Sequence, residues 1–194
     1  IHPAISPGIN SGRVTRRNCC HQVAPLTDRI QRYAARMNRL IGDLVDVTSI
    51  EVGKLAVHAT RGDAALLIGE VIDAFEAAAA ARRIVLAAQV LDRQLLAEFD
   101  RSRLLQVLVN LIGNAVRYSP EGAPVWIRLE REGDLAAVIV ADQGKGIDPA
   151  DQQRIFAKFE RLDAREPGGT GLGLYIARRL ARAMGGDISV DSAP

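Results

Sequence analysis

The chain has 194 residues, of which 48% are hydrophobic, and its charged residues nearly balance to a formal net charge of +2. This length suits one compact domain with an appendage, and the apolar content excludes a chain that is disordered throughout. The even charge balance is not that of a dedicated nucleic-acid binder, so we expect no nucleic-acid partner. An anionic ligand would have to be held locally by a few placed groups.

No apolar run reaches the roughly 20 residues that a transmembrane helix needs, so a membrane anchor would have to lie in segments absent from this sequence. Cys19 and Cys20 are adjacent, and a disulfide between neighbours strains the backbone. No second ligand cluster follows them at the spacing of a zinc site. We therefore expect reduced thiols and a cytoplasmic location.

Prolines and glycines punctuate residues 1–26, which we predict to be an irregular tail. A helix is predicted over 27–52, because Asp28 followed by Gln31 is typical of a helix start and Gly53 ends the pattern. Its apolar residues recur at alternating spacings of three and four: Ile30, Tyr33, Met37, Leu40, Leu44 and Val47. This seam indicates either half of a helical bundle or an amphipathic helix lying on its own domain.

Residues 53–194 alternate between helix and strand patterns. Helices are predicted from Asp63 to about Ala80, from Asp100 to a break at Pro120, and from the glycines near 169 to Met184. Strands are predicted over 55–58, 84–90, 95–99, 125–131, 135–141 and 188–190. The mixture predicts an α+β two-layer sandwich, with a mixed sheet and helices on one face.

The predicted helix before Pro120 carries the first chemical motif. Asn110 and Asn114 are four residues apart and share a face, with Arg117 and Tyr118 one turn further on. Amide oxygens are good ligands for Mg²⁺, and arginine pairs well with phosphate. The alternative is a solvated helix face with no ligand.

The second motif follows the apolar strand over 135–141. A carboxylate at Asp142 could accept a hydrogen bond from an exocyclic amine, and Gly144 and Gly146 would let the backbone approach a flat base. The alternative is an ordinary glycine turn capped by aspartate.

The third motif, Gly168-Gly169-Thr170-Gly171-Leu172-Gly173-Leu174, opens a helix. Backbone amides at a glycine-rich helix start form an anion site that the helix dipole reinforces. The motif is neither a P-loop nor a dinucleotide fingerprint. A flexible loop is the alternative.

In this order, the three motifs resemble the nucleotide site of the GHKL superfamily, whose fold is the Bergerat type, and within it the sensor histidine kinases. Asn110 and Asn114 resemble the N box, and Asp142, Gly144 and Gly146 resemble the first glycine box. The stretch from Ile155 to Arg161 resembles the F box of the ATP lid, and residues 36–44 resemble the second helix of the dimerisation and phosphotransfer domain. The F box and the bundle helix separate histidine kinases from gyrase, mismatch-repair and heat-shock relatives.

The resemblance implies ATP and Mg²⁺ as cofactors, with Asn114 as the magnesium ligand and Asp142 reading adenine. Arg117, Lys158 and Arg161 are the candidates for stabilising phosphate charge. The remaining nucleotide-binding candidates are Asn110, Tyr118, Gly144, Gly146, Ile147, Phe159, Gly169, Thr170, Gly171, Leu172, Gly173 and Leu174. The expected reaction moves the γ-phosphoryl to a histidine and then to an aspartate on a response-regulator receiver domain. The full-length protein is expected to be a homodimer.

The sequence departs from the family at both ends. The acceptor candidate, His21, is followed by Gln22 where the family has an acid, and lies only about 16 residues before Met37, too few for a helix and its return. Self-phosphorylation by this chain is therefore not expected. The family usually adds one more strand after residues 188–190, so we expect a truncated sheet.

Two alternatives remain for the function: a regulatory ATP-binding module without phosphoryl transfer, and a GHKL serine kinase or ATPase. Relatives that hydrolyse ATP carry a carboxylate at the position of Asn110, and an amide cannot act as a general base.

Overall fold

The structure is a computed structural model that describes residues 17–90, 94–133, 135–162 and 169–193, with the backbone alone for residues 17–26, 28, 32 and 36. It contains two compact units, residues 1–42 and residues 43–194, and the helix α1 (Arg17–Glu51) passes from one to the other. In the described part of the chain, no helix is both long and apolar enough to cross a bilayer.

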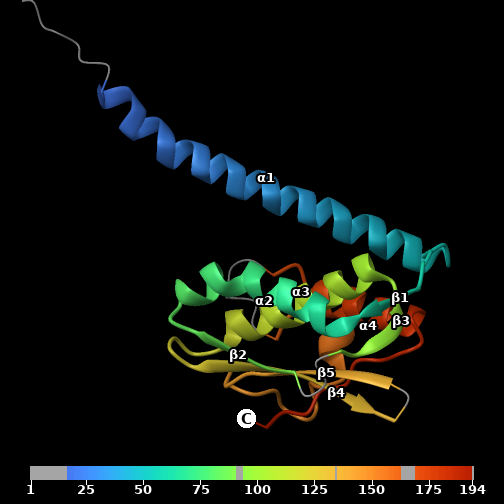
Figure 1. The fold of residues 1–194 in the computed structure, drawn as a ribbon. Coiled ribbons are helices and arrows are strands. Elements are labelled where there is room, and N and C mark those ends of the chain that lie inside the picture. The colour runs from blue at the N-terminus through green and yellow to red at the C-terminus, as the bar shows by residue number, and fades with distance from the viewer. Residues whose placement is uncertain (1–16, 91–93, 134, 163–168, 194) are drawn as a thin grey trace, which may run out of the picture. The chain divides into compact units, whose positions relative to one another are not determined.

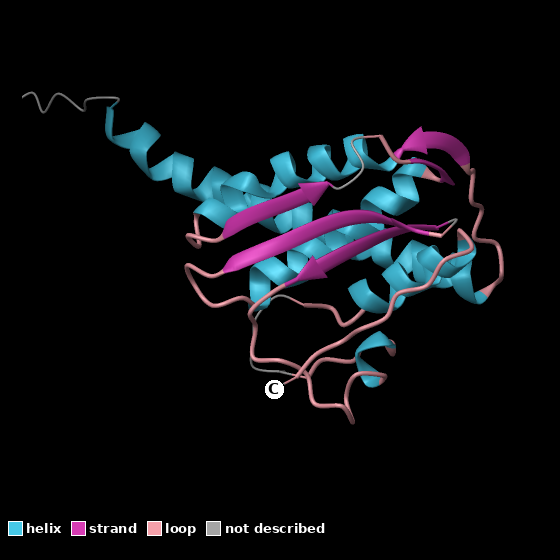
Figure 2. Cartoon of the chain, turned by 60° about the horizontal axis from the view of Figure 1, so that its bottom comes forward, coloured by secondary structure: helices cyan, strands magenta, loops and turns pink. Residues whose placement is uncertain are grey.

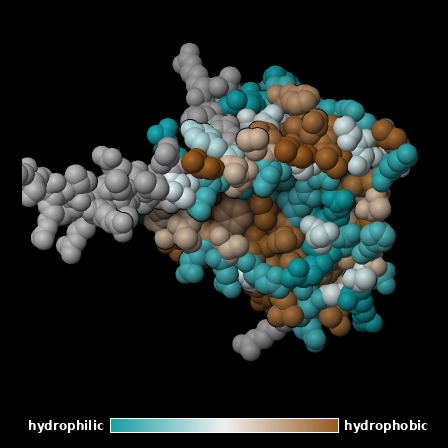
Figure 3. All heavy atoms as spheres, turned by 90° about the horizontal axis from the view of Figure 1, so that it is seen from above, coloured by the Kyte–Doolittle hydropathy of each residue, from teal (hydrophilic) through white to brown (hydrophobic). Residues whose placement is uncertain are grey.

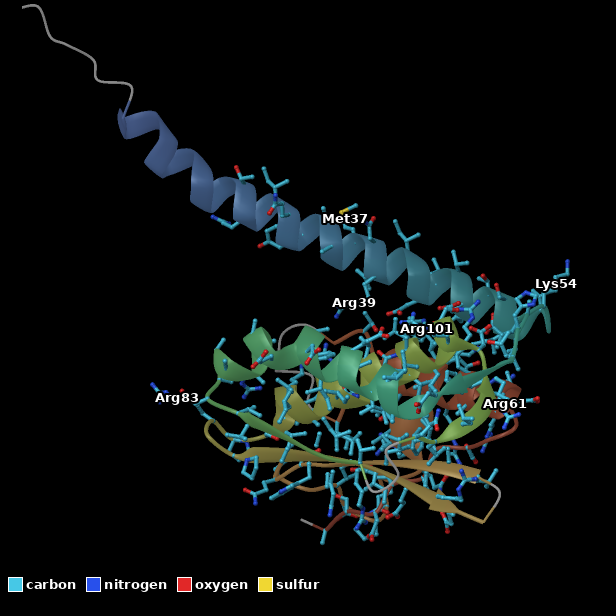
Figure 4. All side chains as sticks on the ribbon, in the orientation of Figure 1. Met37, Arg39, Lys54, Arg61, Arg83 and Arg101 are labelled. Carbon is cyan, nitrogen blue, oxygen red and sulfur yellow. The ribbon has the colours of Figure 1, made fainter. Side chains whose placement is uncertain are left out.

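Helix α1 begins at Arg17, so the irregular tail predicted for residues 1–26 is wrong over its last ten positions. The physical reason is composition: the punctuating glycines and most of the prolines lie before residue 13, and only Pro25 falls inside the helix. The side chain of His21 lies outside the described residues. Within the first unit, Ile30, Tyr33 and Met37 are each about 60% exposed, and Met37 projects from the helix in Figure 4.

The last turns of α1 pack on the second unit. Val47, the last residue of the predicted seam, is buried with apolar residues of two later helices, as expected for a helix that lies on its own domain. Beside it, the buried carboxylate of Asp46 accepts from Arg103 Nη1 at 2.8 Å and from Gln106 Nε2 at 2.6 Å. Residues 43–51 therefore belong to the second unit by their contacts.

The second unit is a two-layer α+β structure. Its main sheet has the order β2-β4-β5, with β2 (Val85–Val90) parallel to β4 (Pro124–Glu132) and β4 antiparallel to β5 (Leu135–Ala141) (Figure 2). A separate pair joins β1 (Thr60–Asp63) to β3 (Leu96–Phe99). Helices α2 (Ala64–Ala80), α3 (Arg101–Tyr118) and α4 (Gly173–Ala183) lie on one side of the main sheet (Figure 1). The predicted mixed sheet with helices on one face is confirmed.

The core lies between these layers. Alternate residues of β4, namely Val125, Ile127 and Leu129, are fully buried against helix residues such as Ile68 and Ile112. Burial of one such side chain contributes roughly 1.5–3 kcal/mol. Viewed from above, the surface mixes apolar and hydrophilic residues (Figure 3), as is normal for a folded domain.

Two predicted strands differ in the structure. The first strand runs over 60–63 instead of 55–58, because the His58 amide donates to the Asp100 carboxylate at 2.9 Å and not to a strand partner. Residues 188–190 form no strand, because side chains hold this segment. The Ile188 amide donates to Asp187 Oδ1 at 2.8 Å, and Gln152 Nε2 donates to the Ser192 carbonyl at 2.7 Å.

Asp100 caps helix α3, as predicted, and orients it. Its Oδ1 accepts from the Ser102 and Arg103 amides at 3.0 and 3.1 Å, while Oδ2 accepts from the His58 amide. These bonds, chiefly that of His58 and then that of the Ser102 hydroxyl, lower the pKa of Asp100 from 3.8 to about 2. The carboxylate is thus stabilised in its charged form.

We expect Asp100→Ala to lower the free energy of unfolding by about 1–2 kcal/mol at neutral pH, because it removes an N-cap. The folded-state pKa lies below the unfolded one, so the contribution of Asp100 is complete above about pH 4 and declines toward about pH 2. Denaturant unfolding at about pH 6 and pH 3 should therefore show a smaller gap between variant and wild type at the lower pH. Asp73→Ala, at an exposed position of α2, is the control. A gap that does not change with pH would contradict the expectation.

Candidate functional site

Helix α3 presents a polar face because its apolar face is fixed in the core. Leu108 and Ile112 are buried against the sheet layer, so the helix cannot rotate freely. Asn110, Asn114 and Arg117 follow one another at spacings of four and three and share another side of the helix. All three are half-buried.

This polar face lies against the glycine-rich loop that precedes α4. A Cβ atom on Gly173 would lie 2.9 Å from Asn110 Oδ1, and one on Gly169 would lie 3.1 Å from Arg117 Nη1. The same Cβ on Gly169 would lie 3.9 Å from Arg161 Nε. The first and third motifs of the sequence therefore meet, and Arg161 reaches the same loop.

The second motif adjoins the C-terminal end of α3. The Gly144 amide donates to Asp142 Oδ1 at 2.7 Å, which orients the exposed carboxylate just after β5. A Cβ on Gly144 would lie 3.3 Å from the Tyr118 carbonyl oxygen, so glycine permits a close approach of this loop to the helix end.

The F-box segment lies close to the same glycine loop. Gly171 has a φ of +71°, and a Cβ there would lie 2.5 Å from the Phe159 carbonyl carbon and 2.8 Å from the Glu160 carbonyl oxygen. Phe159 itself has a φ of +61°, which is unusual for a residue with a side chain, and the residue is 66% exposed. Strained backbone of this kind is concentrated at functional sites.

The start of α4 has the features of an anion site. Its N-cap residue is Leu172, which supplies no side-chain hydrogen bond, and the Leu172 amide donates to Thr170 Oγ1 at 3.2 Å. Leu172 is buried and Leu174 half-buried, so the loop is held to the domain by apolar contacts. The positive end of the helix dipole and its first amides favour a phosphate group here.

The backbone after Gly146 is held by the C-terminal segment. Gly146 has a φ of +74°, and the next amide, of Ile147, donates to Ser192 Oγ at 3.0 Å. Gln152 Nε2 donates to the carbonyl of Ile147 at 3.2 Å as well as to that of Ser192. Gln152 and Ser192 were missed by sequence reasoning, because only the fold brings them to the loop.

The side chain of Lys158 is already bound to a residue of another helix. It forms an ion pair with Glu51 at the end of α1, which raises the pKa of Lys158, and its Nζ lies 5.3 Å from the centre of the Tyr175 ring. The predicted phosphate role of Lys158 would require this pair to break. Of the three cationic candidates, Arg117 and Arg161 are the ones the structure brings to the glycine loop.

A second cluster that the sequence did not reveal supports α4. Asp187 accepts hydrogen bonds from Arg178 and Arg182, at distances between 2.9 and 3.2 Å, which hold its pKa far below the usual range. Arg178 also lies 4.4 Å from the centre of the buried Phe156 ring, in the 3₁₀ turn η1 (Arg154–Phe156) of the F box. The signal in the sequence was the i, i+4 arginine pair followed by an aspartate after two glycines.

The amide oxygens on this face of α3 are of the kind that Mg²⁺ can bind. In the described residues no cluster of three or more His, Cys, Asp or Glu side chains could hold a metal ion. Asn114 offers an amide oxygen on the same side of α3 as Asn110 and Arg117. Mg²⁺ prefers oxygen ligands and usually completes its shell with substrate phosphates and water.

Fold and site together define the class of ATPases that histidine kinases share with gyrase and heat-shock relatives. Residues 99–194 match the family described as histidine kinase-, DNA gyrase B-, and HSP90-like ATPase. The catalytic domain of the histidine kinase ThkA is 30% identical, with a TM-score of 0.60 over 66% of this chain and 82% of that one. A structure of ThkA in complex with the response regulator TrrA is 27% identical, with a TM-score of 0.59 over 77% of this chain and 43% of that one.

Within that class, the chain belongs to the sensor histidine kinases, through their ATP-binding catalytic domain. The circadian input-output histidine kinase CikA of Synechococcus elongatus is 34% identical over 183 residues. That alignment covers 87% of this chain but only 24% of CikA, so the chain spans about a quarter of this relative's length.

Proposed function

We propose that this chain is the Mg-ATP-binding catalytic module of a two-component sensor histidine kinase. One observation carries the proposal: the polar face of α3 and the F-box backbone meet the glycine loop at the start of α4, and the loop at Asp142 adjoins the C-terminal end of the same helix α3. Three segments that are distant in sequence would have no structural need to converge with this chemistry if each were an ordinary turn or solvated face.

Each group has a distinct role in the proposal. Asp142 accepts a hydrogen bond from the exocyclic amine of adenine, and Asn114 holds Mg²⁺ through its amide oxygen. The amides at the start of α4 bind the phosphates, and Arg117 and Arg161 offset their charge. The proposed domain boundaries follow the sequence prediction, with a bundle helix over 27–52 and an ATP-binding domain over 53–194, and the end of that helix, residues 43–51, packs with the ATP-binding domain.

The proposed reaction is an in-line phosphoryl transfer. A bond forms between the γ-phosphorus and a ring nitrogen of the acceptor histidine, while the bond from that phosphorus to the β–γ bridging oxygen breaks and ADP leaves. Positioning and charge stabilisation provide most of the catalysis in such reactions. The phosphoryl group would then pass to an aspartate of a response-regulator receiver domain, the kind of partner that ThkA binds.

We also propose that the full-length protein is a homodimer with this module on the cytosolic side. Ile30, Tyr33 and Met37 are each about 60% exposed in the single chain, so a helix of a second copy could cover these apolar side chains.

Incubation with radiolabelled ATP and Mg²⁺ tests the transfer. The 194-residue chain is tested alone and with an intact acceptor bundle domain from another histidine kinase. We expect acid-labile, base-stable label on the bundle domain, and little or none on the chain alone, since His21 is a poor acceptor. Asn114→Ala should abolish the label, because it removes the proposed Mg²⁺ ligand.

The other outcomes separate the rival functions. Acid-stable label would identify a serine kinase, and release of free phosphate without protein label would identify an ATPase. ATP binding without any transfer would leave a regulatory binding module. Each of these results would overturn the proposed kinase activity.

A further inference from the structure

The last turn of α3 needs partners for its backbone carbonyls. The final carbonyl groups of a helix have no intrahelical donor and carry the negative end of the helix dipole. Here the chain leaves the helix at Ser119, whose backbone is extended and whose amide donates to the Ala115 carbonyl at 3.0 Å. The Ser119 residue is almost fully buried, so water does not readily supply the missing donors.

The side chain of Arg82 supplies hydrogen-bond donors to these carbonyls. Its Nη1 donates to the carbonyl oxygens of Val116 and Arg117, and its Nη2 donates to the Ser119 carbonyl at 3.1 Å. A guanidinium group is suited to this arrangement, because it presents several donors in a rigid plane and a permanent positive charge. One side chain thus caps three carbonyls at the negative end of α3.

Arg82 is itself firmly placed between two elements. It follows α2, where its amide donates to the Ala79 carbonyl at 2.9 Å, and its own carbonyl accepts from the Gly122 amide at 3.2 Å. It therefore connects the turn after α2 to the turn after α3, and its half-buried side chain lies between them.

The turn that Arg82 caps is where the two halves of the proposed nucleotide site meet. Arg117 extends from this turn to the glycine loop, 3.1 Å from the Cβ position of Gly169. The next carbonyl, that of Tyr118, lies against Gly144, whose amide is bonded to Asp142. A shift of the last turn of α3 would move the phosphate side and the base side together.

We propose that Arg82 is a positioning residue for nucleotide binding. Its guanidinium holds the last turn of α3 so that Arg117 faces the phosphate loop and the Tyr118 carbonyl supports the loop that carries Asp142. Arg82 acts through the backbone of α3, and this role rests on the proposed Mg-ATP-binding function.

The neighbouring arginine is a matched control. Arg83 has the same charge, but its side chain is 81% exposed, pairs with the exposed Glu121 at 3.1 Å and points away from the domain in Figure 4. Exposed pairs of this kind contribute little. Replacing either arginine by glutamine removes one positive charge from the same turn, so a difference between the two variants reports the position and not the net charge.

Mg-ATP affinity, measured by titration calorimetry well below the unfolding midpoint of each variant, tests the proposal. We expect Arg82→Gln to weaken binding about tenfold, which corresponds to about 1.4 kcal/mol, and Arg83→Gln to change it less than about twofold. Arg82→Lys should lie between, because lysine keeps the charge but not the planar fork. Amide hydrogen exchange should be faster at residues 116–119 in Arg82→Gln alone.

The outcomes distinguish two failures. If the wild-type chain does not bind Mg-ATP, the proposed function is wrong and the role of Arg82 with it. If the wild type binds and Arg82→Gln binds equally well, the positioning role alone is overturned. Should Arg82→Gln fail to fold, Arg82→Lys decides: wild-type affinity with a lowered unfolding midpoint would make Arg82 a stabilising residue only and overturn the proposal.

Discussion

Asp142→Asn is expected to weaken Mg-ATP binding by roughly 10- to 100-fold, since hydrogen bonds to charged groups contribute about 1.5–3 kcal/mol. The exposed carboxylate is oriented by the Gly144 amide through Oδ1, and under the proposed function it accepts from the exocyclic amine of adenine. The same geometry predicts selectivity, because guanine presents an acceptor oxygen where adenine presents the amine. An asparagine amide can donate to that oxygen, so the preference for ATP over GTP should fall in the variant.

Competition titrations with ATP and GTP on wild type and variant measure both effects. Asp148→Asn is the matched control, because Asp148 also lies in a loop near the site and accepts from the amide two residues on, that of Ala150, at 2.8 Å. Unchanged affinity and selectivity in Asp142→Asn would show that the base does not bind at this loop and would remove the central assignment of the site.

The parts of the fold that could be predicted from sequence are those determined by short-range physics. The caps at Asp63 and Asp100 were predicted because a side-chain carboxylate reaches amides only two or three residues ahead. Strands β4 and β5 were predicted from two segments on either side of a glycine turn. The three glycine and asparagine motifs were found for the same reason, since each is contiguous.

The rest depends on contacts between residues far apart in the chain. Arg82 donates to carbonyls more than thirty positions away, and Asp46 pairs with Arg103 across 57 positions. Lys158, a candidate for stabilising phosphate charge, is paired with Glu51. No local pattern marks an arginine as a cap for a distant helix or a lysine as an ion-pair partner, so these roles appear only once the fold is known.

Gly171→Ala is expected to weaken Mg-ATP binding by about 100-fold or more, because two costs favour a displaced glycine loop over the conformation that binds the phosphates. The left-handed conformation at φ +71° costs a residue with a Cβ roughly 1–2 kcal/mol. The Cβ would also lie 2.5 Å from the Phe159 carbonyl carbon and 2.8 Å from the Glu160 carbonyl oxygen, closer than any real contact. Because both atoms belong to backbone, the F-box segment or the glycine loop must move, and overpacking typically costs about 1–3 kcal/mol more.

A comparison with Gly133→Ala isolates the second cost, the close contact, because this control variant carries only the conformational cost. Gly133 has a φ of +61° in the turn between β4 and β5, and a Cβ there would meet nothing within 4 Å. This control variant should therefore lose stability by the conformational cost alone and bind Mg-ATP as the wild type does. Calorimetric titration with parallel thermal unfolding separates affinity from stability in both variants. Equal Mg-ATP affinity in Gly171→Ala and Gly133→Ala would mean that the close approach of the F box to the glycine loop has no part in nucleotide binding. A loss confined to Gly171→Ala would show that this backbone contact shapes the site where the phosphates bind.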